Sequence, residues 1–566
     1  MKHNILNTGL YGLLVKNAPN KVFISIILSS VAGLLQVMLI PLLVTSFNLQ
    51  AAHIAPGLEY GGAWERWGVR VDSPRFALCF FAACLLILVL RGTSGRLMNE
   101  VVTKLGLDLK RFIYNKVTRA PVQDLEQVGF AALMASLTSD IDKLSTGARM
   151  IPIVLNYLIV IGGVVAMLTY LNPGVMLFIL ACAVVGVACY QPFSHFGGQA
   201  LGQARRCVNQ VIEFNRGLIY GSKELKLNRR KRDAYIAELH QVEDQQRRFQ
   251  LKGGTLFLVG SQFAGLMNML VIGLVAFVMS NFYALSPDAL ISIVMILLYL
   301  SEPMMGIVEC LSSLIPARIS VLAVRKCLRQ LRAESEPETD GKIAIHKLQA
   351  FQLEYAYQVK DQADFQFRVG PVSATFRRGQ VSFITGGNGS GKSTLSKLLS
   401  LHYLPSDGCV MINDERVTDE NRSAMRQNIS AIFTDFHLFP RLYDVAEGEA
   451  GKIAGYMQEL KLEERVSLDD GKFSTLGLSD GQRKRIALLV SYLEDRDVYV
   501  FDEWAADQDP QFKEFFYSTI LFRLRELGKI VIVITHDDRY FHLADQLIKM
   551  ENGALKAIEQ RQALAA

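Results

Sequence analysis

A glycine-rich segment followed by Lys and Ser is the clearest chemical feature of the sequence. Residues 386–394 match the pattern G-x-x-x-x-G-K-[ST] at every defined position, after a strand-like run at 380–385. Glycines let backbone N–H groups approach phosphate oxygens, Lys392 can neutralise phosphate charge, and Ser393 can hold Mg²⁺. The predicted phosphate-binding residues are Gly386, Gly387, Asn388, Gly389, Ser390, Gly391, Lys392, Ser393 and Thr394.

Two adjacent carboxylates, Asp502 and Glu503, end a second apolar run at 497–501. A buried parallel strand delivers its C-terminal end to the ligand in α/β sheets. Because phosphoryl transfer depends on positioning and charge stabilisation, we expect Asp502 to orient Mg²⁺ through its water shell and Glu503 to polarise the attacking water. Taken alone, such a pair is also compatible with ordinary turn chemistry.

The sequence L-S-D-G-Q at 478–482 resembles the signature motif of ABC ATPases, which usually has glycine where Asp480 stands. The resemblance implies that Ser479, Gly481 and Gln482 bind the γ-phosphate of ATP together with the N-terminus of the following helix. We expect Asp480 to be tolerated, because the serine hydroxyl and backbone groups supply these contacts.

Three further positions match the same family. His536, after the apolar run 532–534, matches the switch histidine that bonds the γ-phosphate and holds Glu503 and water in place. Tyr357 matches the aromatic residue that stacks on adenine, with Tyr355 as a competing aromatic, and Asp509 matches the D-loop aspartate that acts across a dimer. The resemblance implies ATP and Mg²⁺ as cofactors. The implied catalytic residues are Glu503, His536 and Lys392.

One position departs from the family pattern. Within residues 429–439, ABC proteins usually carry a glutamine that contacts Mg²⁺ and couples to the membrane domain, and here Thr434 stands in its place. Magnesium accepts hydroxyl, carboxylate and water oxygens alike, so either Thr434 or Asp435 is expected to supply the metal contact. A plain surface turn is the alternative. The implied metal-binding residues are Ser393, Asp502 and Thr434.

The elements that precede this soluble part are apolar enough to cross a membrane. Half of the 566 residues are hydrophobic, and they are concentrated before residue 315. Windows of about twenty apolar residues, the length needed to span a bilayer, occur at 22–47, 76–97, 151–171, 174–193, 255–280 and 288–311. Lys and Arg are abundant in the long connections after the second and fourth windows, which predicts cytoplasmic termini.

The two long connections are polar and favour helix, so the spans are expected to continue into the cytoplasm as helices. The predicted tips, at 121–132 and 209–221, are expected to dock on the ATPase, with a solvent-facing turn as the alternative. The formal net charge of +6 follows from the basic topology signals beside the spans, so no nucleic acid partner is predicted.

The fold class predicted is a membrane all-α domain with six helices at 1–325, a linker at 326–345 and an α/β P-loop ABC ATPase domain at 346–566. This order resembles ABC exporters over nearly the full chain. Residues 221–228, the pair Thr434 and Asp435, and the short stretch between the phosphate-binding loop and the signature further resemble the bacterial cyclic-peptide exporters. That family includes transporters for microcin, syringomycin and pyoverdine precursor.

The resemblance implies a homodimer in the bacterial inner membrane, surrounded by lipid, that exports a peptide by alternating access with its ATPase domain in the cytoplasm. A multidrug or lipid exporter is the alternative, and a periplasmic or outer-membrane partner stays open. A soluble ABC ATPase would lack the apolar windows. A channel or receptor regulator would be expected to have degenerate catalytic residues, which this sequence does not show.

Glu302 is a carboxylate near the middle of the sixth apolar window, beside Pro303. Charge buried in lipid costs several kcal/mol, so Glu302 is predicted to face a cavity and to receive a cationic or donor-rich substrate. The alternative is a structural hydrogen bond to Gln262 or Asn268 of the fifth span.

Overall fold

The computed structural model describes residues 12, 18–52, 64–66, 69–71, 74–279, 282, 287–334, 343–357, 367–443 and 450–560. The chain forms two compact units. The first, here called the helical unit, contains residues 1–118 and 125–331. The second, the sheet unit, contains residues 119–124 and 332–566.

Long helices make up the helical unit. Within the described residues, six helices are long and apolar enough to cross a membrane, which confirms the predicted number of spans. Its helices are α2 (Pro19–Ala52), α3 (Pro74–Thr118), α5 (Phe130–Ala135), α6 (Ile141–Leu171), α7 (Pro173–Tyr220), α8 (Ser222–Leu227), α9 (Arg229–Leu274) and α11 (Pro287–Gln330), with the short helix α4 (Val122–Val128) at the point where the chain passes between the units. A two-stranded hairpin, β1 (Trp64–Arg66) and β2 (Val69–Val71), lies between α2 and α3.

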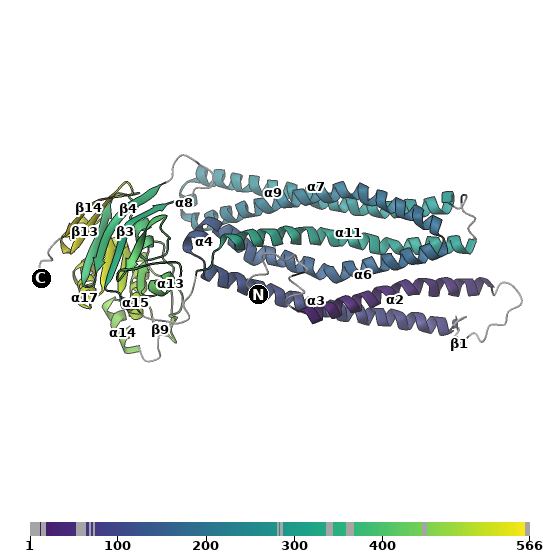
Figure 1. Ribbon diagram of the computed structural model, residues 1–566, viewed down its shortest axis with the longest axis horizontal. Coiled ribbons are helices and arrows are strands. Elements are labelled where there is room, and N and C mark those ends of the chain that lie inside the picture. The colour runs from purple at the N-terminus through teal and green to yellow at the C-terminus, as the bar shows by residue number, and fades with distance from the viewer. Residues whose placement is uncertain are drawn as a thin grey trace. The chain divides into compact units, whose positions relative to one another are not determined.

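The helices pack in pairs. α7 runs along α9, α11 along α6 and α2 along α3 (Figure 1). α6 and α11 approach closely because Gly147 has no side chain: a Cβ at that position would lie 2.3 Å from the Cβ of Ala317. α7 begins sharply at Asn172, whose side chain accepts hydrogen bonds from the N–H groups of Gly174 and Val175, as expected of a helix cap.

The two long reversals, between α3 and α5 and between α7 and α9, differ in how well the sequence locates them. The first, between α3 and α5, falls at 119–129, close to the predicted tip at 121–132. The second does not lie at 209–221, because α7 stays helical to Tyr220. α7 and α9 are instead joined by Gly221, the short helix α8 and Asn228, and Asn228 caps α9 by accepting a hydrogen bond from the N–H of Lys231. α11 likewise continues to Gln330, so residues 326–330 of the predicted linker are helical.

A buried ion pair joins three elements of the helical unit. Asp140, at the end of the π-helical turn η1 (Ser136–Asp140), is fully buried. Arg205 of α7 donates to both of its carboxylate oxygens, at 3.0 and 2.6 Å, and Ser320 of α11 donates to Oδ1 at 3.0 Å. Because every partner is satisfied, the charges can remain buried without leaving an unpaired group.

The sheet unit contains two sheets. A six-stranded sheet has the order β14-β13-β5-β12-β11-β8, in which all neighbours are parallel except β14, and an antiparallel sheet has the order β4-β3-β6-β7. The strands are β3 (Lys347–Ala356), β4 (Arg368–Arg377), β5 (Gln380–Gly386), β6 (Asp407–Ile412), β7 (Glu415–Arg416), β8 (Ile429–Ile432), β11 (Val498–Asp502), β12 (Ile530–Ile534), β13 (Gln546–Glu551) and β14 (Ala554–Gln560), with the short pair β9 (Leu468–Asp469) and β10 (Lys472–Phe473) apart from them.

Helices and turns connect these strands (Figure 1). They are α12 (Lys392–Leu399), α13 (Arg422–Arg426), α14 (Ala450–Glu459), α15 (Asp480–Glu494), η3 (Trp504–Asp507), α16 (Pro510–Phe515), η4 (Phe516–Ile520), α17 (Leu521–Glu526) and η5 (Asp538–Leu543). The parallel strands are buried on both faces, since successive residues of one strand enter different cores. Tyr499 and Phe501 of β11 belong to one apolar cluster, whereas Val498 and Val500 belong to the other. This explains why β11 reads as a continuous apolar run.

We expect Asp140→Ala to destabilise the protein by about 3–5 kcal/mol, because the change leaves the Arg205 guanidinium buried without its carboxylate. Thermal unfolding of the purified, detergent-solubilised chain measures the effect. Asp233→Ala is the matched control, because Asp233 pairs with Arg229 and Arg232 at an exposed position of α9. Equal melting temperatures for the two variants would contradict a stabilising role for the buried pair.

Candidate functional site

The ends of four parallel strands form one edge of the six-stranded sheet. Ile384 of β5 pairs with Ile534 of β12, Ile534 pairs with Asp502 of β11, and Phe501 of β11 pairs with Ile432 of β8. The segments that follow these strands therefore emerge side by side. They carry, in spatial order, the phosphate-binding loop, His536, Glu503 and the turn at 434–435. Ligands of open α/β sheets bind at such a carboxyl edge.

The phosphate-binding loop connects β5 to α12. Gly386, Gly389 and Gly391 all have positive φ, at 153°, 75° and 92°, which side chains rarely adopt. Lys392 opens α12, and its Nζ donates to the carbonyl oxygens of Gly386 and Gly387 at 3.0 and 2.9 Å. Burial lowers the pKa of Lys392, opposed by the nearby carboxylates Glu503 and Asp502. The ammonium group thus lies over the loop that is expected to hold the phosphates.

Glu503 and His536 face each other across two strand ends. The Nε2 atom of His536 lies 2.9 Å from Oε1 of Glu503, and both side chains are partly exposed. Glu503 adopts a left-handed conformation with φ 51°, and its N–H donates to the carbonyl of Ile534 at 3.1 Å. The two residues that the sequence predicts as base and switch are therefore in contact. The backbone turn aims the Glu503 side chain away from the buried strand.

Asp502 ends the buried strand with an unsatisfied oxygen. Its side chain is 2 % exposed, Oδ2 accepts from the hydroxyl of Ser396 at 3.4 Å, and Oδ1 has no hydrogen-bond partner. Burial raises the pKa of Asp502, and the Ser393 hydroxyl opposes this shift. A buried carboxylate oxygen without a partner, beside a serine hydroxyl, fits Mg²⁺, which is usually bound by one or two carboxylates together with phosphate oxygens and water.

No cluster of three or more His, Cys, Asp or Glu residues that could hold a metal exists in the part of the chain that the structure describes. Such a cluster is not needed for a Mg²⁺ ion whose remaining ligands come from phosphates and water.

The signature segment caps α15. Ser479 is the N-cap residue, and its side chain accepts a hydrogen bond from the N–H of Gln482, whose own side chain accepts from the N–H of Ser479. This reciprocal capping box is a known helix start. Asp480 occupies the first helical position and is exposed, so the missing glycine requires no unusual backbone angle. Gly481, in contrast, needs its small size, because a Cβ there would lie 2.7 Å from the carbonyl oxygen of Asp507.

Lys484 is a site residue to which the sequence reasoning assigned no role. It is 3 % exposed on α15, and its Nζ donates to the carbonyl of Glu503 at 2.9 Å and pairs with Asp507 at 2.6 Å. Trp504 is buried beside it and donates its indole N–H to the carbonyl of Lys484. The signature helix and the carboxylate turn are therefore fixed to each other. The run Arg483-Lys484-Arg485 was visible in the sequence, but nothing there showed that its middle residue points inward.

Asp509 lies next to this turn as the N-cap of α16. Its Oδ1 accepts from the N–H of Phe512 at 2.8 Å, and its Oδ2 accepts from Arg485 at 2.6 Å. The hydrogen bond from Phe512 is the main cause of the lowered pKa of Asp509, with a further contribution from Arg485. The Asp509 carboxylate therefore bonds to residues of the same chain. Its role across a dimer stays a prediction.

The two candidate adenine-stacking aromatics differ in burial. Tyr355 is 8 % exposed and belongs to an apolar core of the sheet unit. Tyr357 is more exposed, and its hydroxyl lies 2.9 Å from the hydroxyl of Thr394 in the phosphate-binding segment. Of the two, Tyr357 is therefore the residue that lies at the phosphate-binding segment with an accessible ring.

Thr434 and Asp435 form an exposed turn just after β8. Because Ile432 pairs with Phe501, this turn emerges at the same sheet edge as Glu503. The position agrees with the expected metal contact, while no described hydrogen bond fixes either side chain.

Glu302 of α11 lies in a different place, within the helical unit. It is exposed in the single chain, and it makes no hydrogen bond or ion pair with any described residue. Neither predicted alternative, a bond to Gln262 or to Asn268, occurs among the described residues: the Asn268 amide donates to the carbonyl of Leu297 at 3.2 Å and to Ser301. Arg91 of α3 donates to Asn156 and Gln36 rather than to Glu302. The carboxylate of Glu302 is therefore unneutralised.

Comparisons with known proteins agree with both units. Residues 21–304 match the family model for the ABC transporter transmembrane region, and residues 369–506 match the ABC transporter model. The chain is 32% identical over 471 residues to the ATP-binding protein SyrD of Pseudomonas syringae pv. syringae, covering 81% of this chain and 82% of the relative.

More distant similarities extend over comparable lengths. The ATP-dependent lipid A-core flippase of Bordetella avium is 22% identical, covering 86% of this chain and 85% of its own. A solved structure of a bacterial Atm1-family ABC exporter with ATP bound superposes with a TM-score of 0.75 at 15% identity, over 96% of this chain and 95% of that one. This last likeness concerns the fold.

We expect Glu503→Gln to retain ATP binding but to lower the hydrolysis rate by about a hundredfold or more, because a carboxylate that polarises water is replaced by a neutral amide. Phosphate release and nucleotide binding by the purified protein measure the two effects. Lys392→Ala should instead lose binding. Near-normal hydrolysis by Glu503→Gln would assign the principal role to His536.

Proposed function

The chain belongs to the ABC transporter family and is an ATP-hydrolysing exporter, and on that basis we propose that it exports a peptide, of the cyclic or modified kind or a siderophore precursor. The observation that carries the proposal is the similarity to SyrD at 32% identity across both units, together with the resemblance of residues 221–228 and 434–435 to cyclic-peptide exporters. A multidrug or lipid exporter is the second candidate, since the similarity to the lipid A-core flippase covers 86% of the chain.

The sheet-edge geometry supports these roles in hydrolysis. The loop N–H groups and Lys392 bind the phosphates, and Glu503 orients and polarises the attacking water while His536, 2.9 Å away, fixes its side chain. Ser393, Asp502 and the turn at Thr434 would hold Mg²⁺, which when bound supplies charge stabilisation to the transferring phosphoryl group. Tyr357 would stack on the adenine.

The exposed signature segment supports a homodimer. Ser479 is exposed at the start of α15, and the resemblance to ABC ATPases implies that this serine contacts the ATP of a second copy. The tip of α7 also presents uncovered apolar side chains, with Ile219 70% and Tyr220 80% exposed. Large exposed apolar groups favour a covering partner, and docking of this tip on a second copy would cover them.

The membrane setting is proposed from the same features. The chain is a multi-pass membrane protein. We place it in the bacterial inner membrane with the sheet unit in the cytoplasm. Lys and Arg are abundant in the long connections after the second and fourth apolar windows, and such basic connections stay on the cytoplasmic side. A periplasmic or outer-membrane partner could continue the export route.

Shared ATP sites predict dominant inhibition. If Ser479 acts on the nucleotide of the other chain, mixing wild-type chains with a Ser479→Arg variant should lower ATPase activity below the share of wild-type chains. ATPase titration over mixing ratios tests this, with Ser518→Arg, an exposed helix-surface serine, as the matched control. Activity that is simply proportional to the wild-type share would argue against sites formed between chains.

The peptide proposal is tested by stimulation of ATPase activity in nanodiscs. A panel of cationic cyclic peptides, neutral drugs and lipid A-type lipids is compared at equal concentrations. We expect the peptides to stimulate hydrolysis and the other classes not to. Stimulation by lipids alone would replace the proposal with the second candidate.

Glu302 provides a sharper prediction within this assay. Since its carboxylate is exposed and unneutralised in an apolar span, Glu302→Gln should weaken stimulation by cationic peptides and leave basal hydrolysis and thermal stability intact. Glu213→Gln, an exposed carboxylate of α7 near Arg216, is the matched control. Unchanged stimulation, or a general loss of stability, would favour a structural role for Glu302.

A further inference from the structure

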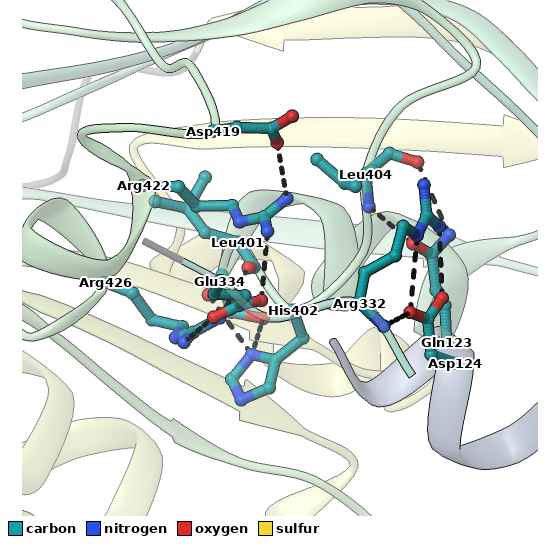
Figure 2. Close-up of polar contacts among 11 residues, drawn as sticks. Gln123, Asp124, Arg332, Glu334, Leu401, His402, Leu404, Asp419, Arg422 and Arg426 are labelled. Atoms are coloured by element: carbon teal, nitrogen blue, oxygen red, sulfur yellow. Dashed lines mark hydrogen bonds and ion pairs between the residues drawn. The ribbon is translucent and has the colours of Figure 1, made fainter. Parts of the chain in front are cut away.

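The chain passes between the helical unit and the sheet unit at three points, namely after residues 118, 124 and 331. The residues beside these points belong to one polar cluster of the sheet unit (Figure 2). We call this cluster the linker clasp. It consists of Gln123, Asp124, Arg332, Glu334, Arg422 and Arg426. Any force that the backbone transmits between the units must enter the sheet unit here.

Asp124 binds the linker to segment 119–124. Its side chain is 2 % exposed and accepts from the N–H of Arg332 at 2.8 Å and from the guanidinium at 3.0 and 3.3 Å. The N–H of Glu334 donates to the carbonyl of Arg119 at 2.8 Å. Two chain segments separated by more than two hundred positions are thus fixed to each other by backbone groups as well as by charge.

Glu334 fixes the linker to α13. Its side chain is 4% exposed and lies between two cations: Arg422 Nη2 at 3.0 Å and Arg426 Nη1 at 3.2 Å, with a second contact to Arg426 Nη2. Arg422 is itself 5% exposed at its side chain and also pairs with Asp419 at 3.3 Å (Figure 2). Removing a buried carboxylate from such a group leaves desolvated cations unpaired, so Glu334 determines whether the arrangement holds.

The clasp also contacts the segment that follows α12, the helix that begins with the predicted phosphate-binding residues Lys392 and Ser393. α12 begins at Lys392, and the chain after its C-terminus carries Leu401 and Leu404. Arg426 donates to the carbonyl of Leu401 at 3.3 Å, and Gln123 accepts from the N–H of Leu404 at 3.2 Å. The segment that directly follows the helix with the predicted phosphate-binding residues is therefore bonded to the linker clasp.

A second contact leads from the clasp to the turn at 434–435. His402 lies beside the clasp, and its ring packs edge-on against Phe433 with centroids 5.1 Å apart. Phe433 directly precedes Thr434. Burial, followed by the charge of Arg426, lowers the pKa of His402 to about 4, so its ring is neutral near pH 7 and adds no third cation to the clasp. The clasp thus adjoins both segments that carry predicted nucleotide contacts.

We propose that Glu334 is a positioning residue that transmits nucleotide state between the sheet unit and the helical unit, by holding the segment after α12 and the 433–435 turn near the points where the chain enters and leaves the sheet unit. This inference rests on the proposed function. It concerns the residue that links hydrolysis to export rather than a residue that touches ATP. The hydrogen bonds between Asp124 and Arg332 add a second connection, between the linker and segment 119–124.

Hydrogen–deuterium exchange of the full-length dimer in nanodiscs tests the proposal without a known substrate. The probe is Mg-ATP with orthovanadate, compared with no nucleotide, and the readout is exchange in peptides covering residues 160–185 of the helical unit. In the wild type, vanadate trapping should change this exchange. In Glu334→Ala we expect the change to be about fivefold smaller, within the range by which coupling residues act, with the KM for ATP and the amount of trapped nucleotide unchanged.

Two further variants make the outcome decisive. Glu334→Gln keeps the shape and should give an intermediate loss, whereas Asp414→Asn removes an exposed carboxylate that pairs with Lys347 and should respond like the wild type. A full exchange response in Glu334→Ala and Glu334→Gln would overturn the proposal. So would loss of ATP binding in step with loss of the response, because Glu334 would then merely hold the fold. A wild-type dimer without any response would refute the proposed export cycle itself.

Discussion

Parallel pairing of β5, β12, β11 and β8 is the constraint on which the nucleotide site depends. The four strands come from widely separated parts of the sequence, and each ends in a residue or loop with chemistry to supply. Parallel pairing places these ends at one edge, and burial of both faces fixes their register. Phe383 and Phe501, both fully buried, show how little room for slippage the strands have. The 2.9 Å contact between His536 and Glu503 is a consequence of that register.

The same sheet edge explains which departures from the family pattern are tolerated. Asp480 begins a helix with ordinary backbone angles and points to solvent, so a side chain costs nothing there. Gly481, one residue later, packs against the carbonyl of Asp507 and has no room for one. Within the same motif, position 480 can therefore carry a side chain, whereas position 481 cannot because the backbone of Asp507 lies too close.

The sequence predicted much of this arrangement, because the decisive signals are local. Six apolar windows, the phosphate-binding loop and the two carboxylates after an apolar strand each identify an element from its own residues, and the resemblance to ABC exporters is confirmed over both units. The signature resemblance similarly located the start of α15. The assignments of individual site residues stay predictions, supported by the geometry of the edge.

What the sequence could not show depends on long-range contacts. Lys484 stands between two other basic residues in the sequence, and nothing local shows that it is buried against the carbonyl of Glu503. The second reversal was placed too early because α7 stays helical through Gly217 to Tyr220. The alternative partner Asn268 predicted for Glu302 was wrong because the Asn268 amide, on α9, bonds to the carbonyl of Leu297 and to Ser301 instead.

The linker clasp illustrates why charged groups suit a junction of this kind. An apolar contact at Glu334 would stabilise the linker without fixing its direction, since apolar burial is non-directional. A carboxylate between two guanidinium groups has preferred geometries, and its loss leaves cations unpaired, so the junction tends to be either assembled or broken. A packed contact that has two discrete arrangements can amplify a small shift of its atoms into a larger movement elsewhere in the protein, whereas a continuously deformable contact absorbs the shift. Glu334 and Arg422, at 4% and 5% side-chain exposure, are both desolvated, so the loss of either partner leaves a buried charge unpaired.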